Sequence, residues 1–367
     1  MSCYRCESCG RDYAYELDVC TFCRTPLEHH AGGDGTVLAV TQVDVPSLGH
    51  EDVPYWCALV RGENGCQVLI KRDVTIEAGA TVSLAAVEAE ELLVVGVLGT
   101  GIMGRGLVEL LLSRGHDVIW VSRSEDALAK GRGRVFDRLA RVMDSDELDG
   151  VSAHLVTSAD PAVLVRCDLV IEAVVEELGP KVEALAHAEA AMRPDAVLAT
   201  NTSGLPLDEL SRGLARPERF GALHFFNPPN RMRLVETSTC GATSPQTSEF
   251  LDDFSRSLGK IPVRVAQRPA FVVNRVLMPL INEAVRSLEE GAASAEAIDE
   301  AIRLGLNHPM GPLALADLIG LDVVLSIMEN LVARTADEAY DPRPLLRQMV
   351  AEGKLGRKTG EGFHSYR

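Results

Sequence analysis

The sequence predicts an α/β protein built on a doubly wound parallel sheet, with small β units before it and an all-α domain after it. A continuous apolar run at 92–98 leads directly into a glycine-rich turn, as expected where a strand buried on both faces enters a helix. From residue 271 onward, apolar residues recur at helix spacing. Further apolar runs alternate with segments of helical character, and they lie at 117–121, 168–173, 196–200 and 219–224.

Length and charge exclude several classes of protein. The 367 residues suffice for two or three domains with cores of their own. A net charge of −17 argues against nucleic-acid binding, which depends on neutralising phosphates. No apolar run is long enough to span a membrane, and the N-terminus lacks the apolar stretch of a secretory signal. We therefore expect a cytoplasmic protein with no membrane or nucleic-acid partner.

The first thirty residues predict a structural zinc site. Two Cys-x-x-Cys pairs stand ten residues apart, and four thiolates in two tight turns can form a tetrahedral shell. Cys3 is an alternative ligand to Cys6, because Cys3-x-x-Cys6 has the same spacing. Free cysteines are the competing interpretation. The predicted zinc ligands of this 1–30 zinc ribbon are Cys6, Cys9, Cys20 and Cys23.

Residues 31–91 predict a small antiparallel β-barrel. Short runs rich in Val, Leu and Thr are separated by turn residues, and they lie at 36–45, 53–61, 66–70 and 80–87. Together with the cysteine pairs, this stretch resembles the zinc-ribbon/OB-fold proteins associated with acyl-CoA and polyketide enzymes. Residues 1–91 carry 6 basic and 15 acidic side chains, so we interpret the module as a docking or structural unit.

The glycine-rich turn predicts a dinucleotide site in a Rossmann domain over 92–268. The spacing is G-x-G-x-x-G between a buried strand and a helix, which is the context that makes this motif specific. Gly99 permits a tight turn, Gly101 lets the backbone approach a pyrophosphate, and Gly104 lets helix and strand pack closely. The helix N-terminus would face the phosphates. The loop residues assigned to the cofactor are Gly99, Thr100, Gly101, Ile102, Met103 and Gly104.

The residues after the second strand leave the choice of dinucleotide open. NAD sites usually carry an acidic residue there, which holds the ribose 2′-hydroxyl. This chain has Ser122 and Arg123 instead, and these can accommodate a 2′-phosphate. Both NAD and NADP therefore remain candidates, with Ser122 and Arg123 as contacts.

Polar residues follow the later strands, at the edge where α/β sheets bind ligands. They include Glu176, Ser203 and His224, and Glu236 follows His224 by twelve residues. A histidine whose second nitrogen is held by a carboxylate is a general base of fixed tautomer. On spacing alone, the alternative that His224 and Glu236 do not contact each other has equal weight.

A set of motifs, in order, resembles the short-chain 3-hydroxyacyl-CoA dehydrogenase family, which includes 3-hydroxybutyryl-CoA dehydrogenases. The resemblance covers about 92–367. The motifs are the glycine loop, Glu172-Ala-Val-Val-Glu-Glu, Asn201-Thr-Ser-Gly, Leu223-His-Phe-Phe-Asn-Pro, Leu234-Val-Glu, Phe271-Val-Val-Asn-Arg, Met310-Gly-Pro, Asp317-x-x-Gly-Leu-Asp322 and Gly356-Arg-Lys-Thr-Gly-Glu-Gly-Phe363.

The resemblance implies an NAD(P)-dependent oxidation of a 3-hydroxyacyl thioester to its 3-oxoacyl thioester. His224 would take the proton of the 3-hydroxyl, and Glu236 would orient His224 and stabilise its imidazolium. Ser203 and Asn274 would position substrate oxygens and the nicotinamide. The remaining implied cofactor contacts are Glu176, Lys181 and Asn227.

The chain also departs from the family where relatives bind coenzyme A. A small hydroxyl and a lysine of the relatives are replaced by Arg138 and Ser145. Coenzyme A could still bind through Arg138 or Arg141. The change equally fits a substrate on an acyl-carrier protein, such as a glyceryl group for polyketide extender units. A non-catalytic assembly protein is the third interpretation.

The last part, 269–367, predicts a helical domain. Apolar residues recur at helix spacing from Phe271 to Gly291, and further amphipathic stretches run over 295–304 and 313–334. By the same resemblance, this domain forms a homodimer.

Overall fold

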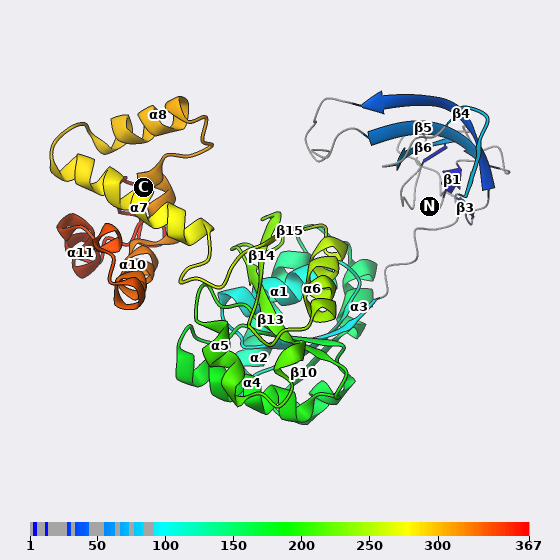
Figure 1. Cartoon of the computed structure of the whole chain (residues 1–367), viewed down its shortest axis with the longest axis horizontal. Helices are drawn as coiled ribbons and strands as arrows, with labels where there is room; N and C mark the ends of the chain where they lie inside the picture. The colour runs from blue at the N-terminus through cyan, green and yellow to red at the C-terminus, as the bar shows by residue number, and fades with distance from the viewer. Residues whose placement is uncertain are drawn as a thin grey trace. The chain divides into compact units, whose positions relative to one another are not determined.

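A computed structural model describes residues 92–366 continuously. Before them it describes 3–5, 12–13, 28–30, 34–43, 55–62, 67–72 and 77–83. The chain divides into two compact units, Met1–Leu92 and Leu93–Arg367 (Figure 1). None of the helices in the described part is both long and apolar enough to cross a membrane.

The described N-terminal strands form two antiparallel sheets. The smaller has the order β2-β1-β3, and the larger has the order β6-β5-β4-β7. The strands of the larger sheet lie close to the predicted runs, but its described strands do not show a closed barrel. The bounds are β1 Cys3–Arg5, β2 Asp12–Tyr13, β3 Glu28–His30, β4 Asp34–Val43, β5 Tyr55–Gly62, β6 Gln67–Arg72 and β7 Thr81–Ser83.

The second unit contains an eight-stranded sheet of order β10-β9-β8-β11-β12-β13-β14-β15. The strands from β8 to β13 run parallel, β14 is antiparallel to β13, and β15 is parallel to β14. The predicted Rossmann-type sheet is confirmed, because the first six strands follow the order 3-2-1-4-5-6. The bounds are β8 Val94–Leu98, β9 Asp117–Val121, β10 Leu155–Ser158, β11 Leu169–Glu172, β12 Val197–Thr200, β13 Phe220–Phe225, β14 Leu234–Thr239 and β15 Ile261–Arg264.

Helices cover both faces of this sheet (Figure 1). Helices α1 (Ile102–Leu112), α2 (Glu125–Leu139) and α6 (Pro245–Ser257) bury their apolar residues in one core. Helix α4 (Leu178–Ala191) and the short α5 (Leu207–Leu210) contribute to a second core. Sandwiched between apolar layers, the central strands are buried along their length, which accounts for their continuous apolar sequence. The remaining elements here are α3 (Ser145–Ala153) and the 3₁₀ turns at Pro161–Arg166, Ser211–Gly213 and Pro217–Arg219.

Three strands of the sheet were not predicted: β10, β14 and β15. β10 and β15 are the edge strands of the sheet and are mostly exposed, so their sequences lack a continuous apolar run, whereas β14 is buried but three of its four buried residues are polar. In β15 three of four residues are exposed, and β10 has one buried residue. Their pairing partners, not their own residue pattern, make them strands.

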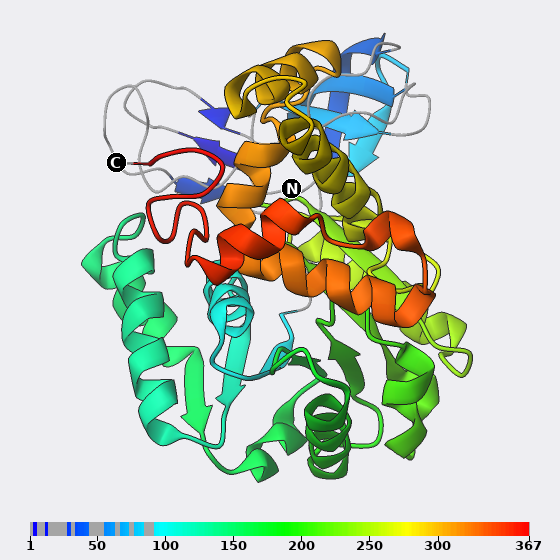
Figure 2. The ribbon, with the colours of Figure 1, turned by 90° about the vertical axis from the view of Figure 1, so that its left-hand side faces the viewer.

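The helices after the sheet pack around a third core (Figure 2). The predicted stretch over 313–334 is two helices, because Gly320 adopts φ = +103° and ends the first of them. Left-handed backbone interrupts a helix at little cost only where the residue is glycine. The bounds are α7 Val273–Glu289, α8 Ala295–Gly305, α9 Pro312–Ile319, α10 Leu321–Thr335, the 3₁₀ turn Glu338–Tyr340 and α11 Pro344–Ala351.

Candidate active site

The glycine loop connects β8 to the start of α1. Gly99 has φ = +103°, and a Cβ there would lie 2.6 Å from the carbonyl oxygen of Ala173. A Cβ on Gly104 would lie 2.1 Å from the carbonyl oxygen of Gly99. At Gly101, by contrast, a Cβ would meet no described atom within 4 Å. At Gly99 and Gly104 a side chain would collide with the protein's own backbone, whereas Gly101 borders open space that a ligand can occupy.

The N-terminus of α1 presents an uncapped helix end beside this open space. Gly101 is its N-cap residue, no side chain caps the first turn, and the first turn holds no acidic residue. The unpaired N–H groups and the helix dipole both favour an anion. The predicted loop residues therefore fit a dinucleotide pyrophosphate, with Ile102 exposed and Thr100 and Met103 half-buried.

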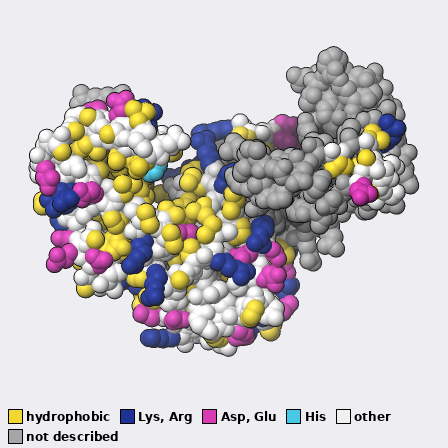
Figure 3. Space-filling model, turned by 45° about the horizontal axis from the view of Figure 1, so that its top comes forward, with side chains coloured by type: hydrophobic (Ala, Val, Ile, Leu, Met, Phe, Trp, Pro, Cys, Tyr) yellow, Lys and Arg dark blue, Asp and Glu magenta, His cyan; other side chains and the backbone are white. Residues whose placement is uncertain are grey.

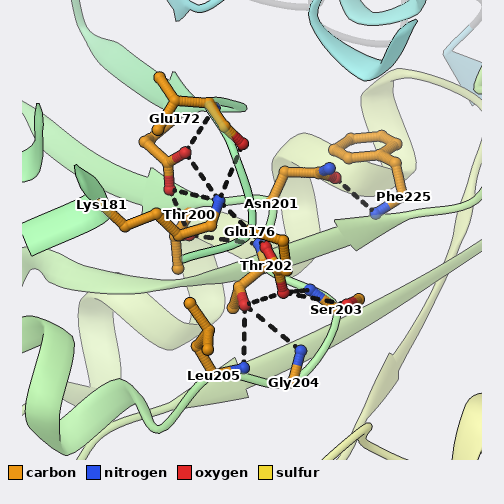
Figure 4. A network of polar contacts seen from close by, with 11 residues as sticks. Glu172, Glu176, Lys181, Thr200, Asn201, Thr202, Ser203, Gly204, Leu205 and Phe225 are labelled. Atoms are coloured by element: carbon orange, nitrogen blue, oxygen red, sulfur yellow. Dashed lines mark hydrogen bonds and ion pairs between the residues drawn. The ribbon is translucent and has the colours of Figure 1, made fainter. Parts of the chain in front are cut away.

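Glu172, Lys181 and Glu176 form a line of charges whose first two members are buried and whose third reaches the surface (Figure 4). The Lys181 Nζ lies 2.8 and 3.0 Å from the two carboxylate oxygens of Glu172 and 3.2 Å from Oε2 of Glu176. Lys181 is 1% exposed and Glu172 is 0% exposed. Thr200 also donates to Glu172, at 2.7 Å. Lys181 is thus enclosed by these protein groups, and its ammonium contacts Glu172 and Glu176.

Glu176 in turn holds the turn after β12. Its Oε1 accepts hydrogen bonds from the Thr202 hydroxyl at 2.6 Å, the Ser203 N–H at 2.7 Å and the Ser203 hydroxyl at 2.9 Å (Figure 4). Burial would raise the pKa of Glu176, but Lys181 and these hydrogen bonds outweigh it and hold that pKa below its ordinary value. Glu176 is therefore ionised at neutral pH, and the Ser203 hydroxyl donates a hydrogen bond to its carboxylate.

His224 and Glu236 face each other across neighbouring antiparallel strands. They are register partners of β13 and β14, which is why residues twelve apart meet. The His224 Nδ1 lies 2.8 Å from Oε2 of Glu236, and both side chains are buried. No described residue hydrogen-bonds the other ring nitrogen, Nε2. A carboxylate on Nδ1 and a free Nε2 are the arrangement of a general acid/base histidine.

The second oxygen of Glu236 is also occupied. Its Oε1 accepts the backbone N–H groups of Val272 and Val273, at 3.1 and 2.9 Å. Burial would raise the pKa of Glu236, yet the hydrogen bonds from His224 and from these N–H groups keep that pKa below its ordinary value. The carboxylate thus stays charged beside His224. Through these hydrogen bonds Glu236 connects β14 to the start of α7, whose second residue is Asn274.

Four further predicted residues make no side-chain hydrogen bond or ion pair in the described part of the chain. Asn274 and Ser122 are half-buried, and Asn227 and Arg123 are exposed. Asn201, which we did not assign to the site, accepts the N–H of Phe225 at 2.9 Å and fixes the chain beside His224. Glu172 and Thr202 were likewise missed. Both stand inside motifs that carry the family resemblance, Glu172-Ala-Val-Val-Glu-Glu and Asn201-Thr-Ser-Gly, but the motifs did not assign them a role.

The predicted zinc ligands lie outside the described residues. These are Cys6, Cys9, Cys20 and Cys23. Among the residues that are described, no group of three or more His, Cys, Asp or Glu side chains has a metal-binding arrangement.

Comparison with known proteins decides the family. Residues 94–268 match the 3-hydroxyacyl-CoA dehydrogenase NAD-binding domain, and residues 271–366 match the 3-hydroxyacyl-CoA dehydrogenase C-terminal domain. The chain belongs to the 3-hydroxyacyl-CoA dehydrogenase family. The family predicted from the motifs is thereby confirmed.

Individual members of the 3-hydroxyacyl-CoA dehydrogenase family align over most of their length. The chain is 42% identical to 3-hydroxybutyryl-CoA dehydrogenase of Clostridioides difficile, over 74% of this chain and 98% of that protein. It is 38% identical to human mitochondrial hydroxyacyl-coenzyme A dehydrogenase, over 78% and 95%. The crystal structure of (S)-3-hydroxybutyryl-CoA dehydrogenase PaaH1 from Ralstonia eutropha superposes with a TM-score of 0.71 at 41% identity, covering 75% of this chain and 99% of that one.

Proposed function

We propose that this protein is an NAD-dependent dehydrogenase that interconverts a 3-hydroxyacyl-CoA and its 3-oxoacyl-CoA. The observation that carries the proposal is the His224–Glu236 pair, whose Nδ1 is held by the carboxylate while Nε2 has no described partner. Nearly full-length relatives with the same pair of domains support it.

The side chains divide the work of this reaction. When bound, the nicotinamide would accept the hydride from C3 of the substrate. His224 takes the proton of the 3-hydroxyl at Nε2, and the charge that develops on its ring is stabilised by Glu236. Ser203 is held by Glu176 through both its N–H and its hydroxyl, so its oxygen is an acceptor fixed in place for the substrate. Asn274, in the first turn of α7, is the candidate partner for the thioester side of the substrate.

A cluster of arginines supports coenzyme A as the carrier. A groove is lined by four arginines and two carboxylates, which are Arg105, Arg134, Arg138, Arg141, Glu109 and Asp137. Burial and the nearby Arg134 and Arg138 lower the pKa of Arg105. Two carboxylates, of which Glu109 lies 3.3 Å from Arg138, do not neutralise four guanidinium groups. The excess positive charge suits the phosphates of coenzyme A.

The substitutions at Arg138 and Ser145 keep an acyl-carrier-protein substrate as the second candidate. The deciding experiment compares acetoacetyl-CoA with carrier-bound 3-oxoacyl and glyceryl substrates, each with NADH and with NADPH. We expect acetoacetyl-CoA to be reduced, and kcat/KM to be higher with NADH. A preference for the carrier-bound substrate would replace coenzyme A in the proposal. Absence of turnover with every pair would refute the dehydrogenase.

Apolar surface supports a homodimer formed through the helical part. Hydrophobic side chains are grouped on its surface in Figure 3. Such a group on a protein surface is a common mark of an interface. The exposed apolar residues of these helices and their connections are Val276, Leu304, Leu306, Leu318 and Val323. Light scattering at micromolar concentration tests for the mass of two chains.

For the N-terminal module, we propose a zinc ribbon bound through Cys6, Cys9, Cys20 and Cys23, followed by an OB-like barrel that docks a partner. The cysteine spacing supports the zinc site. Protein prepared without chelator should contain about one zinc ion per chain, and replacing Cys20 and Cys23 by serine should remove it. A metal-free preparation would refute the site.

A further inference from the structure

Trp120 is a large, fully buried side chain that contacts the glycine loop. It lies on β9 with 0% exposure and pairs in register with Val97 of β8. Its indole N–H donates a hydrogen bond to the carbonyl oxygen of Gly99, at 2.8 Å. A buried indole requires such a partner, and here the partner is the first glycine of the dinucleotide loop.

This hydrogen bond fixes the orientation of one peptide group in the loop. The Gly99 N–H is held by the carbonyl oxygen of Val121 at 3.0 Å, and Gly99 has φ = +103°. The Gly99–Thr100 peptide is trans, so its carbonyl and its N–H point in opposite directions. With the carbonyl held by Trp120, the Thr100 N–H points away from the indole. The next carbonyl, that of Thr100, accepts a hydrogen bond from Nη1 of Arg105 at 2.7 Å. Two successive carbonyls are thus tied to side chains.

The indole also requires a particular residue on α2. A Cβ added to Gly131 would lie 2.5 Å from Cη2 of Trp120 and 3.2 Å from two further ring atoms. Gly131 is buried in the middle of this helix, where glycine lowers stability by about 1 kcal/mol relative to alanine. The space that the indole needs explains why glycine, which helix formation disfavours, stands at position 131.

We propose that Trp120 is a positioning residue for the dinucleotide loop and that Gly131 provides the space that lets it act. Trp120 sets the loop backbone through the Gly99 carbonyl, two residues before the open space at Gly101. The inference rests on the proposed function, because it assigns the residue to a bound dinucleotide. It predicts an effect on dinucleotide affinity and not on the proton transfer at His224.

The experiment compares W120F, which keeps an aromatic ring and loses the N–H, with V118A. Val118 is 1% exposed on the same strand and has no side-chain bond to the loop. NADH dissociation constants and the KM and kcat of acetoacetyl-CoA reduction are measured in the full-length protein. We expect W120F to weaken NADH binding between about 2- and 13-fold, the range for one neutral hydrogen bond. At saturating NADH, kcat should stay within about twofold of wild type. V118A should lower the melting temperature and leave NADH affinity unchanged.

A double-mutant cycle tests the role of Gly131. G131A should weaken NADH binding in the wild-type background, because the added methyl displaces the indole. In the W120F background the shorter ring leaves room, so G131A should add less than a factor of about two.

The outcomes of these experiments distinguish failure of the inference from failure of the proposed function. If wild type binds NADH while W120F binds it equally well, or V118A weakens binding as much as W120F, then the assignment of Trp120 is wrong and the dehydrogenase stands. Additive effects in the cycle would refute the role of Gly131. If wild type neither binds NADH nor reduces acetoacetyl-CoA, both proposals fail together.

Discussion

The His224–Glu236 pair and the cluster of Glu172, Lys181 and Glu176 lie at the same edge of the sheet and differ in which polar atoms they leave without a partner. In the His224–Glu236 pair, one carboxylate oxygen of Glu236 bonds His224 and the other accepts the N–H groups of Val272 and Val273 at the start of α7. Nε2 of His224 has no partner among the described residues. In the other cluster, Lys181 is enclosed by Glu172 and Glu176, and nothing about it is left exposed. Burial of a charged side chain therefore does not by itself identify a reacting group.

The unoccupied atom marks the reacting group instead. Nε2 of His224 has no hydrogen-bond partner among the described residues and is not among their fully enclosed unpartnered atoms, so a ligand can reach it. By this criterion we propose His224 as the reacting residue. Lys181 and Glu172 hold Glu176 in place, and Glu176 holds Ser203. Each prediction below tests this division between a reacting pair and a supporting cluster.

The largest effect is expected for H224Q. Glutamine fills similar space and can bond Glu236, but it cannot take a proton at neutral pH. Because general acid/base catalysis typically contributes 10²- to 10⁴-fold, we expect kcat to fall by about that factor. Steady-state reduction of acetoacetyl-CoA measures it, and an unchanged melting temperature serves as the control. Retention of more than about a tenth of wild-type kcat would remove His224 from the mechanism.

A loss approaching that of H224Q is expected for E236Q. The backbone N–H groups of Val272 and Val273 would keep the amide oxygen at the Oε1 position, so the amide nitrogen would face His224. That nitrogen donates, which forces Nδ1 to accept and leaves the proton on Nε2, the wrong tautomer for a base. We expect kcat for oxidation of 3-hydroxybutyryl-CoA to fall roughly 10²-fold. Full activity would show that Glu236 has only a structural role.

For the supporting cluster, the main effect of K181M should be on stability. Removing the cation leaves two facing carboxylates, and breaking a buried pair on one side typically costs about 3–5 kcal/mol of unfolding free energy. Denaturant unfolding measures this loss, and E172Q in the same chain should recover part of it.

K260M is the matched control for this substitution. Lys260 is also buried, but its Nζ donates to the carbonyl oxygen of Pro229 and has no described carboxylate partner. Burial, with Arg114 nearby, lowers its pKa. K260M should therefore cost less than about 1.5 kcal/mol. Equal losses in K181M and K260M would contradict the view of Lys181 as the centre of an ionic cluster.

The smallest effect is expected in the pH dependence of stability. The pKa values of Glu176 and Glu236 lie below their ordinary value of 4.5 in the folded protein. Their stabilising contribution is then fully present above pH 4.5 and is lost as the pH falls through the lower, folded values. The unfolding free energy of wild type should decline in this acid range, and it should decline less steeply in E176Q and in E236Q. Parallel profiles for all three proteins would contradict both pKa directions.

Short-range sequence patterns predicted the parts of the site that depend on neighbours in the chain. Strand, glycine turn and helix follow one another without interruption, so Gly99, Gly101 and Gly104 could be assigned from their spacing. The helix break at Gly320 was missed, because glycine spacing alone does not tell whether a residue takes a positive φ. Glu172 was also missed as a functional residue, since its partner Lys181 lies nine positions away on another element.

The sequence by itself determined the family, the parallel sheet and the dinucleotide loop, because these depend on local hydrophobic pattern and on ordered motifs. The register of β13 with β14 set His224 opposite Glu236 and left Nε2 free, and no spacing rule specifies that register. Packing of α2 on β9 likewise placed Trp120 against both Gly99 and Gly131. Contacts between distant elements form only when the whole core is buried, and so the tertiary structure alone decided which polar atoms are satisfied and which remain free to react.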